Sequence, residues 1–409
     1  MNVLQIHSSD HLGGGGGTVA MERLHQGLLL AGVDSRVLCG RKTTRSSLSK
    51  PIPGSRMLKR VESYLGKVTS ELGLNDINYL SSFKIRSMKE YQNADILHFH
   101  GTHGFFNYLA LPKLVKHKPA VFTLHDMWPL TGHCAYSYDC DRWKIGCGQC
   151  PYPETHPAIK RDNTRLEWKL KKWAYQQSHL TIIVLCEWLK QYSEQSLLKD
   201  LPIYKIPNGL DVDTYQPLDK GKCRAVLGIP EASKVLMFVA LQLNDRRKGV
   251  DLLIKSLQSL PKSIKKDMVL LVLGEGGQVF SDLVGIKTLD LGYVRNDRFK
   301  AIAYSAASLF IFPTRADNLP LVLQESMACG TPMVSFNVGG IPELVRPNLT
   351  GYLAEPENAK QLSEGMLQLL EDDSQRNFLE QKCREIATKE YGVDLQVKRH
   401  LRLYEKFFK

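Results

Sequence analysis

The apolar positions of this chain fall into short runs that alternate with segments of helical spacing. Residues 3–7 form a buried-type run, glycines 13–17 follow, and the apolar positions of residues 19–29 then recur every three or four residues. Residues 36–39 form the next apolar run. This order predicts a strand, a glycine-rich turn, a helix and a second strand.

Further runs of this kind continue along both halves of the chain, and their nearly unbroken apolar character is typical of parallel strands covered on both faces. They are residues 96–100, 120–124, 180–185, 234–240, 268–274, 288–292, 309–313 and 331–336. Helical patterns lie between them, for example at residues 249–260. Alternating strands and helices predict an α/β protein with two doubly wound, Rossmann-like domains.

The boundary between the domains is expected in residues 201–217, a segment rich in Pro, Asn, Gly and Asp. We therefore predict a first domain at 1–200 and a second at 201–390. Residues 391–409 are helical by pattern, and in such folds the last helix often crosses back to the first domain.

Length, charge and hydropathy narrow the class of protein. A chain of 409 residues suits two domains. No apolar run reaches the ~20 residues that span a bilayer, and the N-terminus lacks the features of a secretory signal, so we expect a cytoplasmic location.

Residues 41–67 hold eight basic residues and one acidic residue, a net charge of +7 within a chain of +12. This segment indicates an anionic partner or a solvated basic surface; without interleaved aromatic residues or a known module, nucleic acid is not expected.

Residues 56–72 combine this basic character with an amphipathic pattern. The apolar side chains fall near one face of a helix, and the basic ones lie elsewhere. The apolar positions are Met57, Val61, Tyr64, Leu65, Val68 and Leu72, and the basic ones are Arg56, Lys59, Arg60 and Lys67. Docking on an anionic membrane surface and packing of the apolar face on the protein's own core explain this pattern equally well.

Candidate chemistry lies in the loops after the strands, because ligands of open α/β sheets bind beyond the carboxyl ends of the strands. The glycine run lets backbone approach a diphosphate at a helix N-terminus, although a flexible turn is an equal alternative. After residues 309–313, Asp317 and Glu325 bracket a loop and the start of a helix. Glu325 lies in an apolar stretch, which is unusual for a solvated carboxylate.

Residues 317–332 resemble the region with two acids eight positions apart in the family 4 retaining glycosyltransferases, which have the GT-B fold with two domains facing each other across a deep cleft. The resemblance is greatest to the exopolysaccharide branch, the colanic-acid-type transferases, and it covers nearly the whole chain. The motifs that carry it are GGGGTVA (14–20), HDMWPLTG (125–132), CDRWKIGCGQCP (140–151), IPNGLD (206–211), RKG (247–249) and GGIPE (339–343).

This resemblance implies a role for each matching residue. Glu325 would bind the donor ribose, Asp317 would lie near the transferred sugar with the N–H groups of Asn318 and Leu319, and Lys248 would neutralise the leaving diphosphate. Gly16 and Gly17 would approach that diphosphate, and His125 would line the reaction centre. Arg247 would assist Lys248, and the base would be bordered by Gly292, Tyr293 and Val294. Without the resemblance, a core histidine would be the better interpretation of His125.

Two positions depart from the family pattern and put roles in doubt. The first acid of the pair is Asp317, one methylene shorter than glutamate, and Gln242 stands where many members have an arginine. Phosphate stabilisation would then depend on Lys248, with Arg246 or Arg247 as substitutes.

The expected reaction needs no metal, because no D-x-D carboxylate pair lies in a donor loop to hold a divalent ion. The chain also offers no clear nucleophile paired with a base, so we expect front-face substitution with retention. We expect a UDP- or GDP-linked sugar as donor and a glycan or lipid-linked acceptor, in bacterial polysaccharide biosynthesis. A sugar-nucleotide epimerase of the same fold and a non-catalytic sugar-nucleotide-binding homologue are the alternatives.

Four of the nine cysteines cluster in a short segment. Cys134, Cys140, Cys147 and Cys150 have spacings that would complete a tetrahedral, structural zinc site. Disulfides, a redox pair and free thiols are the alternatives, and two disulfides do not suit a cytosolic protein.

Overall fold

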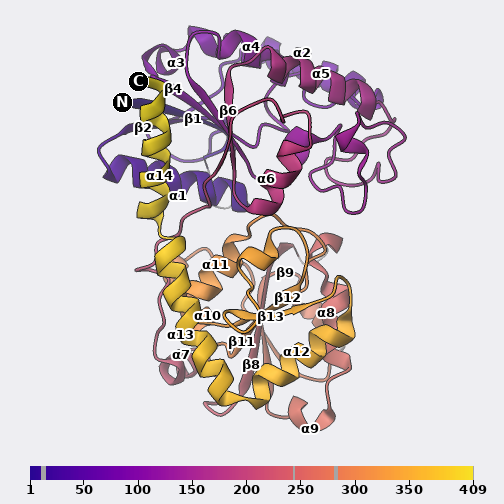
Figure 1. The fold of residues 1–409 in the computed structure, drawn as a ribbon, viewed down its shortest axis with the longest axis vertical. Helices are drawn as coiled ribbons and strands as arrows, with labels where there is room; N and C mark the ends of the chain where they lie inside the picture. Colours follow the sequence, from indigo (N-terminus) through magenta and orange to yellow (C-terminus); the bar gives the residue numbers. More distant parts are fainter. Residues whose placement is uncertain (11–14, 243–244, 281–283, 409) are drawn as a thin grey trace. The chain divides into compact units, whose positions relative to one another are not determined.

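The computed structural model describes residues 1–10, 15–242, 245–280 and 284–408. Gly13 and Gly14 of the glycine run and Lys409 of the predicted last helix lie outside the described residues. The chain divides into two compact units, Met1–Pro207 with Gln396–Lys409, and Asn208–Leu395 (Figure 1). The sequence placed the boundary at 200–201; the structure divides the chain at 207–208, because residues 203–205 form a last strand of the first unit.

The first unit is built on a parallel sheet in the order β3-β2-β1-β4-β5-β6-β7. Its strands are β1 (Asn2–Ser9), β2 (Asp34–Arg41), β3 (Ser49–Pro51), β4 (Ile96–His100), β5 (Ala120–Leu124), β6 (Leu180–Val184) and β7 (Ile203–Lys205). Every residue of β4, β5 and β6 is buried, as expected of parallel strands covered on both faces.

Helices cover this sheet on its two faces (Figure 1). They are α1 (Gly16–Leu30), α2 (Arg56–Glu71), α3 (Lys89–Asn93), α4 (Leu111–Leu114), α5 (Thr164–Gln176), α6 (Glu187–Glu194) and most of α14 (Val393–Glu405). Short 3-10 turns lie at Leu80–Ser87, Tyr108–Ala110, Trp128–Leu130 and Arg142–Lys144. Helix α14 packs on β4, where the Tyr404 hydroxyl lies 2.7 Å from Nδ1 of the buried His98.

The second unit repeats this architecture with the sheet order β10-β9-β8-β11-β12-β13, again parallel throughout. Its strands are β8 (Lys234–Gln242), β9 (Met268–Glu275), β10 (Lys287–Asp290), β11 (Leu309–Phe312), β12 (Met333–Phe336) and β13 (Gly351–Ala354). Its helices are α7 (Lys220–Val226), α8 (Val250–Gln258), α9 (Lys262–Lys265), α10 (Asp297–Ala306), α11 (Leu321–Ala328), α12 (Ala359–Glu371) and α13 (Asp373–Glu390).

The predicted fold class, two doubly wound α/β domains, is therefore confirmed. In each sheet the chain reverses its direction of strand addition once, between β1 and β4 in the first unit and between β8 and β11 in the second. Loops that leave neighbouring strands at such a point diverge to opposite faces and leave a crevice, which is where ligands of these folds bind. Among the described residues, the structure has no helix that combines the length and apolarity needed to cross a bilayer.

Candidate functional site

Three histidines gather at the reversal point of the first sheet. His7 lies near the end of β1, His100 ends β4, and His125 follows β5. Nδ1 of His100 lies 3.2 Å from Nε2 of His125, and Nε2 of His100 lies 2.6 Å from the Gln5 side-chain oxygen. The structure therefore joins the predicted His125 to two histidines that sequence reasoning did not select.

Burial keeps these imidazoles uncharged. It lowers the pKa of His7 to about 3, with a contribution from the neighbouring His125, and it lowers the pKa of His125 itself to about 4. The pKa of His100 is lowered in the same way by burial and by its histidine neighbours. At neutral pH this cluster can exchange hydrogen bonds with a substrate but carries no charge of its own.

Gly17 brings the glycine-rich turn close to these histidines. Helix α1 begins at Gly16, directly after Gly15 in a left-handed conformation (φ 90°). A Cβ atom on Gly17 would lie 3.6 Å from the His125 ring and 3.7 Å from Nε2 of His7. The predicted strand and the helix after it are thus confirmed, and Gly17 in the first turn of α1 lies beside His125.

An ion pair lies next to this cluster. Nε2 of His103 lies 3.6 Å from Asp126, whose other carboxylate oxygen accepts a hydrogen bond from the Trp128 N–H at 2.8 Å. Burial disfavours charge on both side chains, but their interaction outweighs it, raising the pKa of His103 and lowering that of Asp126. Sequence reasoning quoted Asp126 only as part of a motif and missed His103; the recurrence of His and Asp just after predicted strands was the signal for both.

Cationic side chains gather at the reversal point of the second sheet. Arg247 and Lys248 follow β8, and Asp317 follows β11. A single carboxylate oxygen of Asp317 accepts hydrogen bonds from Arg247 and from Lys248, each at 2.9 Å. Burial raises the pKa of Asp317, but the two cations outweigh it and lower the pKa. Burial, together with the neighbouring Arg247, lowers the pKa of Lys248 in spite of Asp317. Arg247 also forms an ion pair with Asp245 at 3.4 Å, so these two cations are held by two carboxylates.

Glycine is required where the backbone packs tightly around this cluster. Gly249 has φ 68°, and a Cβ atom there would lie 1.8 Å from the Pro313 carbonyl oxygen. A Cβ atom on Gly339 would lie 2.1 Å from the Asp317 carbonyl oxygen, which accepts a hydrogen bond from the Gly340 N–H at 3.2 Å. The glycines of the RKG and GGIPE motifs thus hold the loops that carry Lys248 and Asp317 in place.

Glu325 lies on α11, one of the helices of this unit. It is buried, and the Tyr304 hydroxyl lies 3.3 Å from one of its carboxylate oxygens. The neighbouring Gln324 donates a hydrogen bond to the Asn208 carbonyl at 2.9 Å, which ties the helix to the IPNGLD motif. Its burial is in keeping with the apolar stretch around it; its role in binding ribose stays a prediction.

The other predicted donor residues lie in loops of the same unit. The Asn318 N–H donates to the Asp317 side chain at 3.0 Å, so this group is occupied within the cluster. Leu319 is buried beside it. Gly292, Tyr293 and Val294 follow β10, and Tyr293 is 39% exposed, so its ring surface is accessible to a planar ligand.

The clustered cysteines do not form a metal site as they are placed. All nine cysteines are free thiols. The Cys147 sulfur accepts a hydrogen bond from the Gly132 N–H at 3.2 Å, and the Cys150 sulfur lies 3.1 Å from Nε2 of His133. Across the described part of the chain, no three His, Cys, Asp or Glu side chains are grouped closely enough to hold an ion. This geometry does not fit the predicted zinc site of Cys134, Cys140, Cys147 and Cys150, which stays a prediction from the sequence.

Two doubly wound domains with a cationic cluster at the reversal point of the second sheet define a class of proteins that bind anionic ligands at strand ends. Two family models match the chain: "Glycosyltransferase Family 4" over residues 14–214 and "Glycosyl transferases group 1" over residues 219–389. The chain belongs to the family 4 glycosyltransferases.

Individual proteins agree with this assignment. The chain is 26% identical over 380 residues to the putative colanic acid biosynthesis glycosyl transferase WcaC of Escherichia coli K12, covering 87% of this chain and 88% of that protein. Among solved structures, sucrose-phosphate synthase from Thermosynechococcus elongatus superposes with a TM-score of 0.70 at 19% identity, covering 100% of this chain and 99% of that one. Anabaena HepE in complex with UDP-glucose gives 0.68 at 16% identity, covering 99% and 100%. These structural similarities show the fold.

Proposed function

We propose that this glycosyltransferase transfers a hexosyl group, with retention of configuration, from a UDP- or GDP-linked sugar to a glycan or lipid-linked acceptor in bacterial polysaccharide biosynthesis. The observation that carries the proposal is the cluster of Arg247, Lys248 and Asp317, whose two cationic side chains lie at the strand ends where such folds bind ligands. The UDP-glucose bound to HepE and the colanic-acid assignment of WcaC support the donor class and the pathway class.

Each predicted site residue of the second unit has a proposed part in donor binding. Lys248, assisted by Arg247, neutralises the charge that develops on the leaving diphosphate, which is where electrostatic stabilisation contributes most. Glu325 accepts hydrogen bonds from the two ribose hydroxyls. Asp317 and the N–H groups of Asn318 and Leu319 lie near the transferred sugar, and the base is bordered by Gly292, Tyr293 and Val294.

The proposed reaction is a front-face substitution that needs no metal ion. The bond between the anomeric carbon and the diphosphate oxygen breaks, the acceptor oxygen bonds to that carbon from the same face, and the acceptor proton passes to the leaving phosphate oxygen. Gly16 and Gly17 contact the diphosphate through backbone N–H groups. His125 lines the reaction centre as a neutral imidazole, consistent with its low pKa. The cytoplasmic location stays a prediction from the sequence.

The proposal is tested in two stages with the whole chain. A panel of UDP- and GDP-sugars is screened by thermal unfolding, because a ligand that binds only the native state raises the midpoint. The donor found there is incubated with candidate glycan and lipid-linked acceptors, and the product's anomeric configuration is read by NMR. An inverted product would contradict the retaining mechanism. Epimerisation without transfer, or binding without turnover, would favour the two alternative functions.

A further inference from the structure

Helix α2 exposes its apolar side chains to solvent. Met57 is 77% exposed and Tyr64 69%, and Val61, Val68 and the following Leu72 are 40–42% exposed. Their spacings of four, three, four and four residues place them in one stripe along the helix. The one buried residue of α2 is Glu62, and Leu65 is partly buried. The sequence left open whether this stripe packs on the core; the exposed fractions exclude that alternative.

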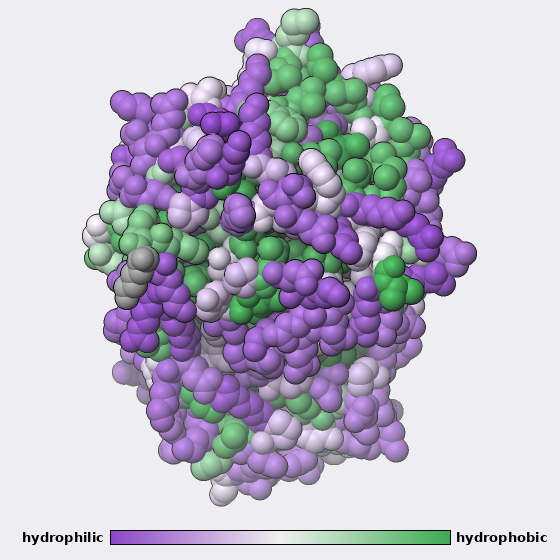
Figure 2. All heavy atoms as spheres, turned by 45° about the horizontal axis from the view of Figure 1, so that its top comes forward, coloured by the Kyte–Doolittle hydropathy of each residue, from purple (hydrophilic) through white to green (hydrophobic). Residues whose placement is uncertain are grey.

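The stripe belongs to a wider apolar surface. Single exposed apolar residues are normal, but a contiguous group of them marks an interaction surface. The start of α5 is joined to the end of α2, since Asn163 donates a hydrogen bond to the Leu72 carbonyl at 2.5 Å. Helix α5 adds the exposed Leu166 and Trp173, seven residues apart on one face. Figure 2 brings the upper part of Figure 1 forward, where α2, α4 and α5 are labelled, and shows apolar side chains gathered there.

Basic side chains accompany the stripe, and their charge is not neutralised. Arg56, Lys59, Arg60 and Lys67 are exposed, and within the described ranges none of them has an ion-pair partner. The two acids of the helix are engaged elsewhere. Glu62 accepts a hydrogen bond from the Ser81 N–H at 2.5 Å, and Glu71 pairs with Lys160. The surface is therefore apolar and positively charged together, which complements an anionic partner with an apolar interior.

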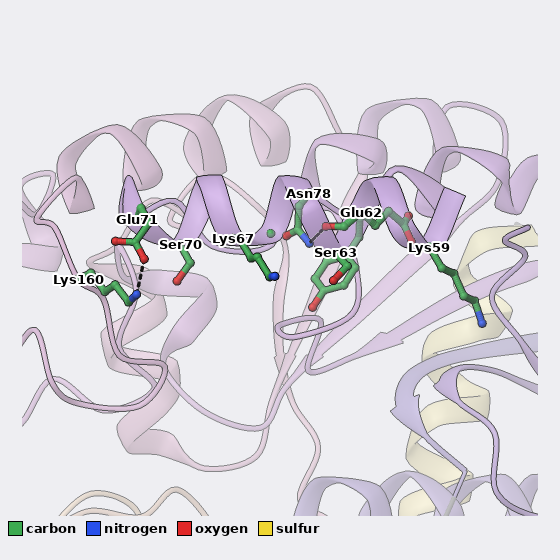
Figure 3. A pocket seen from close by; sticks show the side chains of 10 residues that line it. Lys59, Glu62, Ser63, Lys67, Ser70, Glu71, Asn78 and Lys160 are labelled. Carbon is green, nitrogen blue, oxygen red and sulfur yellow. Dashed lines mark hydrogen bonds and ion pairs between the residues drawn. The ribbon is translucent and has the colours of Figure 1, made fainter. Parts of the chain in front are cut away.

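A polar cavity borders the flank of the same helix. It has a volume of about 710 Å³, and its charged lining residues are Lys59, Lys67, Lys160, Glu62 and Glu71 (Figure 3). Lys160 is paired with Glu71, so the ammonium groups of Lys59 and Lys67 are the ones that suit the phosphate of a lipid headgroup, whereas the apolar stripe suits the boundary between headgroups and acyl chains.

We propose that α2 docks this chain on a bilayer that contains anionic lipid, lying in the plane of the membrane surface. The stripe of Met57, Val61, Tyr64, Val68 and Leu72 enters the headgroup–acyl boundary, and Arg56, Lys59, Arg60 and Lys67 contact lipid phosphates. A second copy of the chain is a poorer occupant, because a two-fold interface through α2 would bring the same four cations of each copy together. The inference rests on α2 and the surface around it and does not depend on the proposed reaction.

The test is flotation of the full chain with vesicles of phosphatidylcholine, with and without about 30% phosphatidylglycerol. We expect the partition coefficient to be at least ~10-fold higher on the anionic vesicles and to fall as salt screens the charges. The double variant Met57→Ser/Tyr64→Ser removes apolar surface, and Arg56→Glu/Arg60→Glu reverses charge. Each should lower anionic-vesicle binding at least ~10-fold with an unchanged unfolding midpoint, since all four side chains are exposed.

Matched controls come from exposed positions of the second unit. Phe378→Ser and Lys360→Glu change the same kinds of side chain away from α2 and should bind vesicles like the unmodified chain. Equal recovery on neutral and anionic vesicles, or unchanged binding of Met57→Ser/Tyr64→Ser, would overturn the proposal. So would a dimer, measured by light scattering without vesicles, that this double variant converts to a monomer, because the stripe would then cover a second copy.

Discussion

The two domains share one sheet topology, but the side chains at the reversal point are neutral in the first domain and charged in the second. At the reversal point of the first sheet, His7, His100 and His125 are buried and uncharged. At the reversal point of the second sheet, Arg247 and Lys248 hold Asp317 in ion pairs. The comparison teaches that the fold determines where the strand-end loops meet, whereas the residues placed there determine which ligand groups each domain can contact.

The difference has a simple physical origin. An isolated buried imidazole loses its proton because desolvation disfavours the charged form. Lys248 and Asp317 meet the same desolvation but face each other at 2.9 Å, so each offsets part of the other's cost. The first domain therefore offers neutral imidazoles as hydrogen-bonding groups. The second offers the cationic side chains of Arg247 and Lys248 to a diphosphate.

A bound zinc ion would change this comparison most, because Zn²⁺ with four thiolate ligands would place a charged group in the first domain. The sequence prediction of zinc at Cys134, Cys140, Cys147 and Cys150 expects about one equivalent in protein purified without chelator, and a closed site of this kind contributes on the order of 10 kcal/mol to folding. Elemental analysis measures it, with Cys147→Ser/Cys150→Ser as the metal-free control. Less than about 0.2 equivalents, with thiols that are readily alkylated, would contradict the zinc prediction.

The next largest effect concerns a buried cation of the first domain outside its histidine cluster. Lys171 donates hydrogen bonds to the carbonyls of Trp128 and Thr131 at 2.9 and 3.1 Å, and burial lowers its pKa while raising that of the nearby Glu167. Lys171→Ala leaves these two buried carbonyls without their donor and removes the ammonium group that lies over the Trp128 ring at 3.4 Å, so it should lower the free energy of unfolding by about 2–5 kcal/mol. Denaturant unfolding measures the change. The exposed Lys169→Ala on the same helix is the control, and equal stability of the two variants would contradict a stabilising role of the Lys171 hydrogen bonds.

A smaller effect tests donor recognition by the second domain. Glu325→Gln keeps the size of the side chain and removes its charge, so the hydrogen bonds to ribose hydroxyls lose their charge assistance. We expect nucleotide affinity to fall about 10- to 100-fold, measured by calorimetry, with an unchanged unfolding midpoint. The exposed Glu364→Gln is the control. A Glu325→Gln variant that binds nucleotide as tightly as the parent would show that Glu325 is structural.

The smallest effect is the pH dependence that neutral histidines impose. His125 has a pKa of about 4 when folded and near 6.5 when unfolded, so between these values the unfolded chain binds more protons. The neutral His125 makes its full contribution to the free energy of unfolding above pH 6.5. As the pH falls toward 4, this contribution decreases by up to about 1.4 kcal/mol per pH unit. His125→Gln should reduce the slope of unfolding free energy against pH by up to this amount, with the exposed His117→Gln as control. An unchanged slope would mean that His125 carries charge when folded.

Much of this picture was predictable from the sequence because it depends on local pattern. The apolar runs located most of the strands, and the motif order identified Lys248, Asp317 and Glu325. The short strands β3, β7 and β13 were missed, since three or four residues carry too little periodicity.

The Lys248–Asp317 ion pair joins positions 69 residues apart, and the sequence assigned these two residues separate roles. Likewise, only the structure shows that the stripe of α2 is exposed, because an amphipathic pattern does not say what covers its apolar face.

The most direct test of the account is the turnover of Lys248→Ala with the donor identified above, compared with that of the exposed Lys262→Ala. Removing one charge-stabilising group at the diphosphate should lower the rate of transfer by about 10²-fold or more. The control should react like the unmodified enzyme, and neither variant should need added Mg²⁺ or Mn²⁺. Turnover of Lys248→Ala close to that of the control, or strict dependence of the unmodified enzyme on a divalent cation, would contradict the proposal that this cationic cluster performs the diphosphate chemistry.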